Sequence, residues 1–131
     1  MDLRINSKSH VPVHVQLEEQ IKHLVLTGGF AVGSRLPSIR ALAGYLRVNR
    51  NTVARVISDL EREGFVKSRR GSGVYVVAPP VAEEDIKRQV VLEKAMDLAA
   101  ARGVPVEELA YALLARAGVQ TPEKMPVLFV E

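Results

Sequence analysis

One short stretch of the chain concentrates side chains that can form hydrogen bonds with nucleic-acid bases. Its members are Asn49, Arg50, Asn51, Thr52 and Arg55. Arginine can donate two hydrogen bonds to guanine O6 and N7, asparagine can pair in the same bidentate way with adenine N6 and N7, and threonine can bind a phosphate or contact a thymine methyl. These residues suit the start of a helix that enters the DNA major groove. The alternative is a solvent-exposed helix start with an asparagine cap.

A glycine-containing turn further along the chain carries a second basic cluster. Lys67, Arg69 and Arg70 precede Gly71 and Gly73. Because glycine has no Cβ, a backbone that contains it can approach a phosphate or the minor groove closely. An ordinary turn with arginines for solubility would look similar, but the position after the first cluster favours contact with the flanking DNA backbone.

Arg35 and Arg40 are candidates for phosphate contacts on the other side of the first cluster. Arg40 is placed on a short helix, opposite Ile39 and Leu42, and Arg35 precedes that helix. Phosphate contacts position a protein on DNA without reading the base sequence. The alternative is ion pairing with carboxylates of the same protein surface, which is a stronger rival for Arg35 than for Arg40.

The rest of the chain offers little catalytic chemistry. It has no cysteine, which excludes disulfides, thiolate metal ligands and a cysteine nucleophile. His10 and His14 are four residues apart, but Pro12 between them disfavours a helical pair, so we expect no metal or other cofactor. No GxSxG serine motif, phosphate-binding loop or acid–base pair is present, so we expect no enzymatic activity.

Apolar residues at helical spacing predict three helices that position these clusters, after a polar and flexible arm at residues 1–11. The helices run from Pro12 to Gly28, from Ser38 to Leu46 and from Asn49 to Gly64. Proline suits a first helical turn, asparagine suits an N-cap and glycine suits a left-handed C-cap. A loop at 29–36 joins the first two helices.

Two strand-like segments, 65–68 and 74–77, flank the basic turn and predict a hairpin. A short helix pair followed by a hairpin is the order of a winged helix-turn-helix. The predicted fold class is therefore mainly α with a small β-hairpin.

Prolines at positions 79 and 80 predict a linker, and we place a domain boundary there. Residues 1–78 form the predicted DNA-binding domain. Residues 79–131 form a linker and a two-helix segment, with helices at about 82–102 and 105–117 and a strand-like tail, MPVLFVE.

Composition and charge agree with binding to a polyanion. The 131 residues are 47% hydrophobic and 25% charged, and the net charge of +3 divides into +6 for residues 1–80 and −3 for residues 81–131. Such asymmetry points to nucleic acid as the partner of the first part. No signal peptide or membrane-spanning stretch is visible, so we expect a soluble cytoplasmic protein.

The stretch from Val11 to Val77 resembles the DNA-binding domain of the GntR family of bacterial transcription regulators. The resemblance rests on PVHVQLEEQI, the LPS-x-R-x-LA run, VNRNTVARVISDLEREG and GSGVYV, taken in order. The start VNRNTV and the short C-terminal part are similar to the YtrA-like subfamily. The resemblance implies a homodimer that binds a two-fold-symmetric operator in double-stranded DNA.

The resemblance also implies which residues contact DNA. The family's contacting positions fall on Arg40, Arg50, Asn51 and Thr52, and its wing glycine falls on Gly71 or Gly73. One position departs from the family pattern, since many members have arginine where this chain has Ala54. We therefore expect a different operator sequence.

The sequence as a whole predicts a sequence-specific DNA-binding transcription regulator, with repression favoured. The apolar faces of the last two helices suggest a dimerisation segment rather than a ligand pocket. Two alternatives stay open: the DNA-reading part of a larger, ligand-sensing regulator, and a winged helix that binds proteins. The operator sequence and any small-molecule effector are not specified by these residues.

Overall fold

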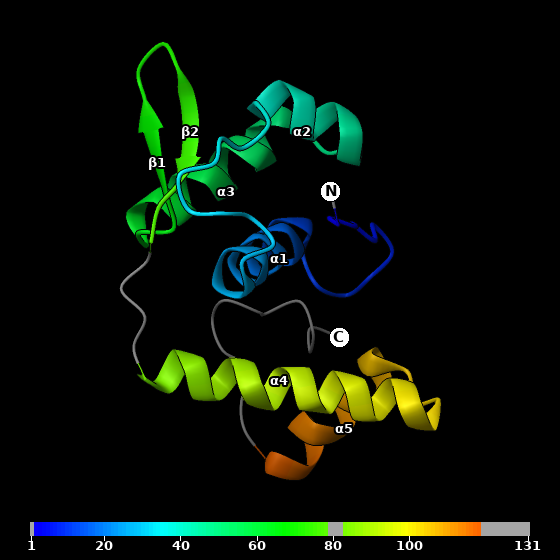
Figure 1. The fold of residues 1–131 in the computed structure, drawn as a ribbon. Coiled ribbons are helices and arrows are strands. Elements are labelled where there is room, and N and C mark those ends of the chain that lie inside the picture. The colour runs from blue at the N-terminus through cyan, green and yellow to red at the C-terminus, as the bar shows by residue number, and fades with distance from the viewer. Residues whose placement is uncertain (1, 79–82, 119–131) are drawn as a thin grey trace. The chain divides into compact units, whose positions relative to one another are not determined.

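A computed structural model describes residues 2–78 and 83–118. Their elements are α1 (Val13–Thr27), α2 (Ile39–Leu46), α3 (Arg50–Arg62), β1 (Val66–Arg69), β2 (Gly73–Val76), α4 (Glu83–Arg102) and α5 (Val106–Ala117) (Figure 1). The chain divides into two compact units, Met1–Pro80 and Val81–Glu131. The helical first unit with its single hairpin confirms the predicted winged-helix fold class.

The first three helices begin and end at the predicted sequence signals. The carbonyl of Pro12 accepts the first hydrogen bonds of α1, and Gly28 ends that helix with a left-handed φ of +83°. Ser38 and Asn49 cap α2 and α3, since the side-chain oxygen of each accepts a hydrogen bond from a free backbone N–H, at 3.0 and 2.7 Å. These caps satisfy donors that a helix start leaves unpaired.

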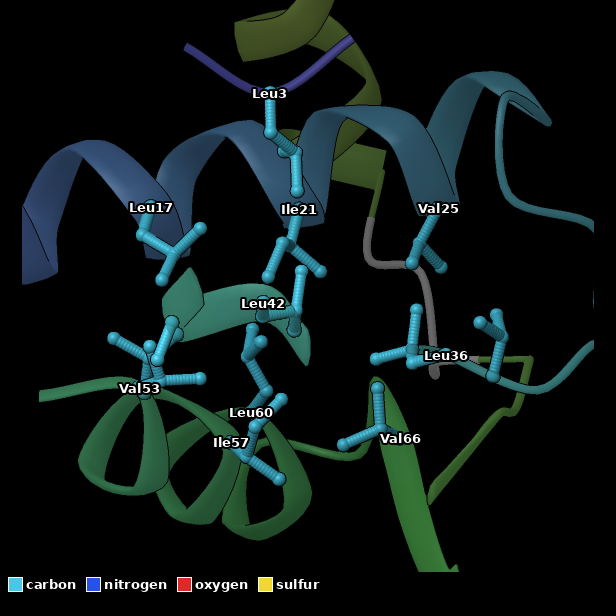
Figure 2. Packing of buried hydrophobic residues seen from close by; sticks show 13 residues of the cluster. Leu3, Leu17, Ile21, Val25, Leu36, Leu42, Val53, Ile57, Leu60 and Val66 are labelled. Atoms are coloured by element: carbon cyan, nitrogen blue, oxygen red, sulfur yellow. The ribbon is translucent and has the colours of Figure 1, made fainter. Parts of the chain in front are cut away.

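The core of the first unit lies between α1 on one side and α2, α3 and the hairpin on the other. Figure 2 shows Leu17 and Ile21 of α1 facing Leu42 of α2 and Leu60 of α3. Each of these four side chains is at most 1% exposed. Burial of a leucine or isoleucine side chain stabilises a fold by about 1.5–3 kcal/mol, so this contact fixes α3 against α1.

A short segment before α2 pairs with β2 as a third extended element of the hairpin sheet, which the sequence did not indicate. β1 and β2 are antiparallel, with Lys67 opposite Tyr75 and Arg69 opposite Gly73. Arg35, in the segment predicted as a loop, forms a further antiparallel bridge with Tyr75, supported by bonds from Leu36 N to Val74 O at 2.8 Å and from Val76 N to Ser34 O at 2.9 Å. Each strand also lies about one residue from its predicted position.

The N-terminal arm is irregular as predicted, but the expectation that it is flexible was wrong. Leu3 is 3% exposed and belongs to the core. The side chain of Gln20 on α1 forms two hydrogen bonds with the backbone of Arg4, and that of Gln16 forms two with Asn6 and one with Val11, with lengths of 2.7 to 2.9 Å. The two side-chain amides supply the hydrogen-bond partners that the backbone of the arm would otherwise lack. They therefore anchor a segment that has no regular secondary structure.

The described part of the second unit contains α4 and α5, which contact each other and are joined by residues 103–105. Val104 N donates to Ala99 O at 2.9 Å, which closes the end of α4. Within residues 2–78 and 83–118, no helix is long and apolar enough to cross a membrane. The strand expected at residues 125–131 lies outside the described residues.

Lys22 of α1 joins the first helix to the end of α3. Its Nζ lies 2.7 Å from Glu63 Oε1 and 3.2 Å from Glu18 Oε1. Burial alone would lower the pKa of Lys22, but the two carboxylates raise it above its ordinary value of 10.5. Burial and the nearby Glu63 raise the pKa of Glu18, so the cation holds together two carboxylates that would otherwise repel each other.

We predict that Lys22→Met destabilises the fold by about 1–2 kcal/mol at pH 7 and by less at pH 4. The raised pKa means that Lys22 stabilises the fold below pH 10.5 and loses this effect as pH rises through its folded-state pKa. Removing the Lys22 ammonium leaves the carboxylates of Glu18 and Glu63 close together. Their repulsion acts at pH 7 and weakens toward pH 4, where they become protonated. Urea unfolding at both pH values, with Lys8→Met as an exposed control, measures the difference; an equal loss at both values contradicts this account.

Candidate nucleic-acid interface

The exposed start of α3 is the central part of the candidate interface. Val53, Val56 and Leu60 are fully buried on the inner face of α3, and Arg50 and Asn51 are exposed in its first turn. Thr52 is half-buried and lies at the edge of this face. A helix with its apolar side packed and its polar N-terminal turn exposed has the geometry needed to enter a groove.

The side chain of Asn49 caps α3, and this role limits which of its atoms can contact DNA. Its Oδ1 accepts a hydrogen bond from Asn51 N at 2.7 Å and so caps α3. The side-chain NH₂ group of Asn49 keeps its donor capacity. Asn49 therefore suits a contact to a phosphate better than a bidentate contact with adenine.

The structure separates Arg55 from Arg50. At about 100° per residue, the two side chains leave α3 roughly 140° apart. The pKa of His14, at the start of α1, is lowered by burial and by the nearby charge of Arg55, and Asp59 opposes this effect. Arg55 therefore leaves α3 on a different side from Arg50, and its charge acts on the start of α1.

The hairpin presents cations around one tyrosine on a single face of its sheet. Lys67 and Arg35 are both direct cross-strand neighbours of Tyr75, so their side chains leave the same face. The guanidinium of Arg69 lies over the Tyr75 ring at 4.7 Å from its centroid. Ser72 and Tyr75 share a hydrogen bond between their hydroxyl groups.

Sequence reasoning did not assign Tyr75 to the site. The signal that could have found it was the strand alternation Lys67, Arg69 and Val74, Val76, which places Tyr75 on the polar face. The missing information was the pairing of Arg35 with β2, because it joins residues forty positions apart. Figure 1 shows the hairpin after α3, with its turn as the part of the hairpin farthest from α1.

Gly73 and Gly71 shape the turn of the hairpin in different ways. Gly73 has φ +132°, and a Cβ there would lie 2.7 Å from Arg35 Nε. Gly71 has φ +75°, and a Cβ there would meet nothing within 4 Å. Gly73 therefore makes room for Arg35 against the hairpin, whereas Gly71 keeps the tip of the turn open.

Several arginines of the first unit are left without protein partners. In the described residues, the guanidinium groups of Arg40, Arg50 and Arg70 form no hydrogen bond or ion pair, and all three residues are exposed. The carboxylates are engaged elsewhere, as Asp59 binds Arg62 and Glu61 binds Ser68. The free cations are available to an external anion.

The described residues contain no group of three His, Asp or Glu side chains placed to hold a metal ion. The candidate interface consists of cations, amides and glycine backbone. These groups can bind a polyanion such as the phosphate backbone of DNA.

A family model described as "Bacterial regulatory proteins, gntR family" matches residues 14–76. This range contains α1 except for its first residue, together with α2, α3 and the hairpin. Every residue predicted to contact DNA lies within it.

Two regulators of Bacillus subtilis match the same part of the chain. The HTH-type transcriptional repressor YtrA is 39% identical over 74 residues, which are 56% of this chain and 57% of YtrA. The uncharacterized HTH-type regulator YisV is 44% identical over 70 residues, which are 53% of this chain and 14% of YisV. The chain thus spans less than two thirds of the length of either relative.

Two solved structures are similar to the chain. YtrA from Sulfolobus acidocaldarius, a GntR-family transcription factor, is 30% identical with a TM-score of 0.57, and the match covers 74% of this chain and 99% of that one. AraR(DBD) in complex with operator ORE1 is 25% identical with a TM-score of 0.50, covering 59% of this chain and 94% of that one.

We predict that Gly73→Ala destabilises the hairpin by about 1–3 kcal/mol, because its φ is strained for alanine, and also displaces Arg35. Gly71→Ala is the matched control, with a positive φ but open space around its Cβ. The NMR resonance of Arg35 Nε–Hε should move in Gly73→Ala and stay in place in Gly71→Ala. An unmoved resonance in Gly73→Ala would show that Arg35 does not pack on this glycine.

Proposed function

Since the chain belongs to the GntR family of bacterial regulatory proteins, we propose that it is a transcription repressor that binds a two-fold-symmetric operator as a homodimer. The observation that carries this proposal is the exposed first turn of α3, where the side chains of Arg50 and Asn51 form no hydrogen bond or ion pair within residues 2–78 and 83–118. The cationic hairpin that follows α3 supplies the flanking contact.

Base recognition is assigned to the start of α3. Arg50 can donate two hydrogen bonds to a guanine, Asn51 can pair with an adenine, and Thr52 can contact a thymine methyl or a phosphate. The operator complex formed by AraR(DBD), a domain with the same fold, supports DNA as the partner. Ala54 has only a methyl group, so we expect no hydrogen-bonded base contact from that position.

Backbone positioning is assigned to the residues around α3. Arg40 on α2, Asn49 at the cap and Arg35, Arg69 and Arg70 on the hairpin face are suited to phosphates. Gly71 and Gly73 allow the turn to approach the DNA closely. Arg55 lies apart from these groups, so we assign it a smaller part, at the outer edge of the interface.

Dimerisation is assigned to the second unit because its described residues, 83–118, bury very little apolar surface. Among its described residues with recorded exposure, only Ala99 is buried. Large apolar side chains stay exposed, namely Ile86, Val90, Val91, Leu92, Met96, Leu98, Val104, Val106 and Leu113. A segment this small usually needs a partner to bury such surface. We propose residues 1–78 as the DNA-binding domain and 79–131 as the linker and dimerisation segment.

A dimer would explain a symmetric operator. Two copies of α3 would enter successive major grooves on one side of the duplex, about 34 Å apart. Repression is supported by YtrA of B. subtilis, which is named a repressor. A protein that acts on chromosomal DNA works in the cytoplasm of a bacterium, which is where we place it.

Two other functions make different predictions. A protein-binding winged helix would show no salt-dependent affinity for DNA. The DNA-reading part of a larger, ligand-sensing regulator would bind DNA, but its effector domain would lie in further chain, as the 14% coverage of YisV illustrates. Binding-site selection with the purified protein separates the first of these from our proposal.

We predict that Arg50→Ala and Arg70→Ala weaken DNA binding in different ways. Arg50→Ala should cost about 1–3 kcal/mol on the selected operator and relax discrimination at one base, because a base contact is lost. Arg70→Ala should weaken operator and random DNA alike and reduce the salt slope by about 0.9, because a phosphate contact is lost. Fluorescence anisotropy over a salt series measures both.

The charge-matched control for this pair is Arg102→Ala at the end of α4, which should leave both affinities unchanged. Equal losses on operator and random DNA for Arg50→Ala would contradict base recognition by Arg50. An unchanged salt slope for Arg70→Ala would contradict its phosphate contact.

We predict that glutamates on an apolar face of α4 convert the dimer to monomers. Val91 and Leu98 are seven residues apart and share one face, while Ile86 and Val90 share another; the exposed fractions of these side chains lie between 44% and 65%. Two lost apolar contacts per protomer should weaken dimerisation by about 100-fold or more. Light scattering on V91E/L98E and I86E/V90E tests this, and a dimer that persists in both variants contradicts the proposal.

A further inference from the structure

Arg47, at the turn between α2 and α3, has a backbone conformation that arginine seldom adopts. Its φ and ψ are +56° and +48°, and it is the non-glycine residue with positive φ among residues 2–78 and 83–118. In this left-handed region, the Cβ of an L-residue crowds a neighbouring carbonyl oxygen. The turn therefore holds Arg47 in a strained state.

The chain uses glycine at the equivalent place after its other helices. Gly28, Gly64, Gly103 and Gly118 follow α1, α3, α4 and α5, and each has a positive φ. Glycine adopts this conformation without a steric penalty. At α2 the same C-cap geometry, with the Arg47 N–H bonded to Ala43 O, is made by an arginine. The side chain of Arg47 thus has to supply something that glycine cannot.

The surface around Arg47 indicates what its side chain supplies. Arg40 and Gly44 lie one turn apart on one face of α2, and Arg47 follows directly after the last residue of that helix. All three are exposed, and a Cβ at Gly44 would meet nothing within 4 Å, which leaves open space between the two arginines. In the described residues, neither guanidinium has a hydrogen bond or an ion pair.

Arg47 also lies close to the proposed base-reading turn. Two residues lie between it and Arg50, so the Cα atoms of the two arginines are at most about 11 Å apart. The major groove is about 12 Å wide. When Arg50 reaches base edges inside the groove, Arg47 is within one groove width of it, a distance that matches a phosphate at the edge of the groove.

We propose that Arg47 binds a DNA backbone phosphate on the same strand segment as Arg40, and that its strained conformation is retained for this contact. The inference rests on the proposed DNA binding. A competing explanation is that the cation stabilises the C-terminal end of the α2 dipole. That role would act on the stability of the folded protein and leave DNA affinity unchanged.

Three full-length variants separate the strain from the charge. R47G removes both the positive charge and the backbone strain. R47Q removes the charge but keeps the strained left-handed backbone, and R47K keeps both the charge and the strain. R102Q, at the end of α4, is the control for loss of one positive charge outside the first unit. The probe is a fluorescein-labelled 30-base-pair duplex of mixed sequence, titrated from 50 to 300 mM salt, with thermal unfolding measured in parallel.

We expect R47G and R47Q to reduce the salt slope by about 0.9, which corresponds to roughly fivefold weaker binding at 0.15 M salt. R47G should at the same time melt a few °C higher than the parent protein, because the strain is relieved. R47K should bind with the parent slope, and R102Q should not differ from the parent in affinity.

Parent-like affinity and slope in both R47G and R47Q would overturn the proposal and favour the dipole role. A lower melting temperature for R47G, with DNA affinity unchanged, would do the same. If the parent protein itself fails to bind the duplex at 50 mM salt, the proposed DNA binding fails, which is a distinct result from failure of the Arg47 contact.

Discussion

The orientation of the whole interface depends on the burial of one face of α3. Val53, Val56 and Leu60 have no exposed surface, and they pack against α1 through Leu17 and Ile21. Because successive residues of a helix are about 100° apart, this packing determines which residues face outward. A rotation by one residue would bury polar side chains and expose the core residues. The exposed position of Arg50 and Asn51 is thus a consequence of hydrophobic packing rather than of any contact they make.

The same packing separates the two signs of charge. Lys22 binds both Glu18 and Glu63 between α1 and the end of α3. Asp59 binds Arg62 of the same helix, and Glu61 binds Ser68 of β1. The arginines near the start of α3 keep no such partners in the described part of the chain. A net charge of +6 on residues 1–80 then acts mainly through these free cations. This explains how a chain with a net charge of only +3 can present a strongly basic face.

Local signals were sufficient to predict most of the first unit. Pro12, Asn49 and Gly28 predicted helix ends, and apolar spacing predicted the inner face of α3, because both depend on residues close together in sequence. The bridge from Arg35 to Tyr75 could not be predicted, since it joins distant segments through backbone bonds that carry no side-chain pattern. The anchored arm was missed for a similar reason: the side chains of Gln16 and Gln20 bind backbone groups whose identity the sequence does not show.

The strain at Arg47 could not be predicted either, because an arginine between two predicted helices gives no sign of a left-handed backbone. DNA contact by the individual site residues stays a prediction.

Two copies of α3 are proposed to read a symmetric operator. Hydroxyl-radical footprinting on the duplex selected by the purified protein tests this most directly. We predict two protected half-sites related by two-fold symmetry and about one helical turn apart. A single asymmetric protected patch, or no protection at all, would contradict the account.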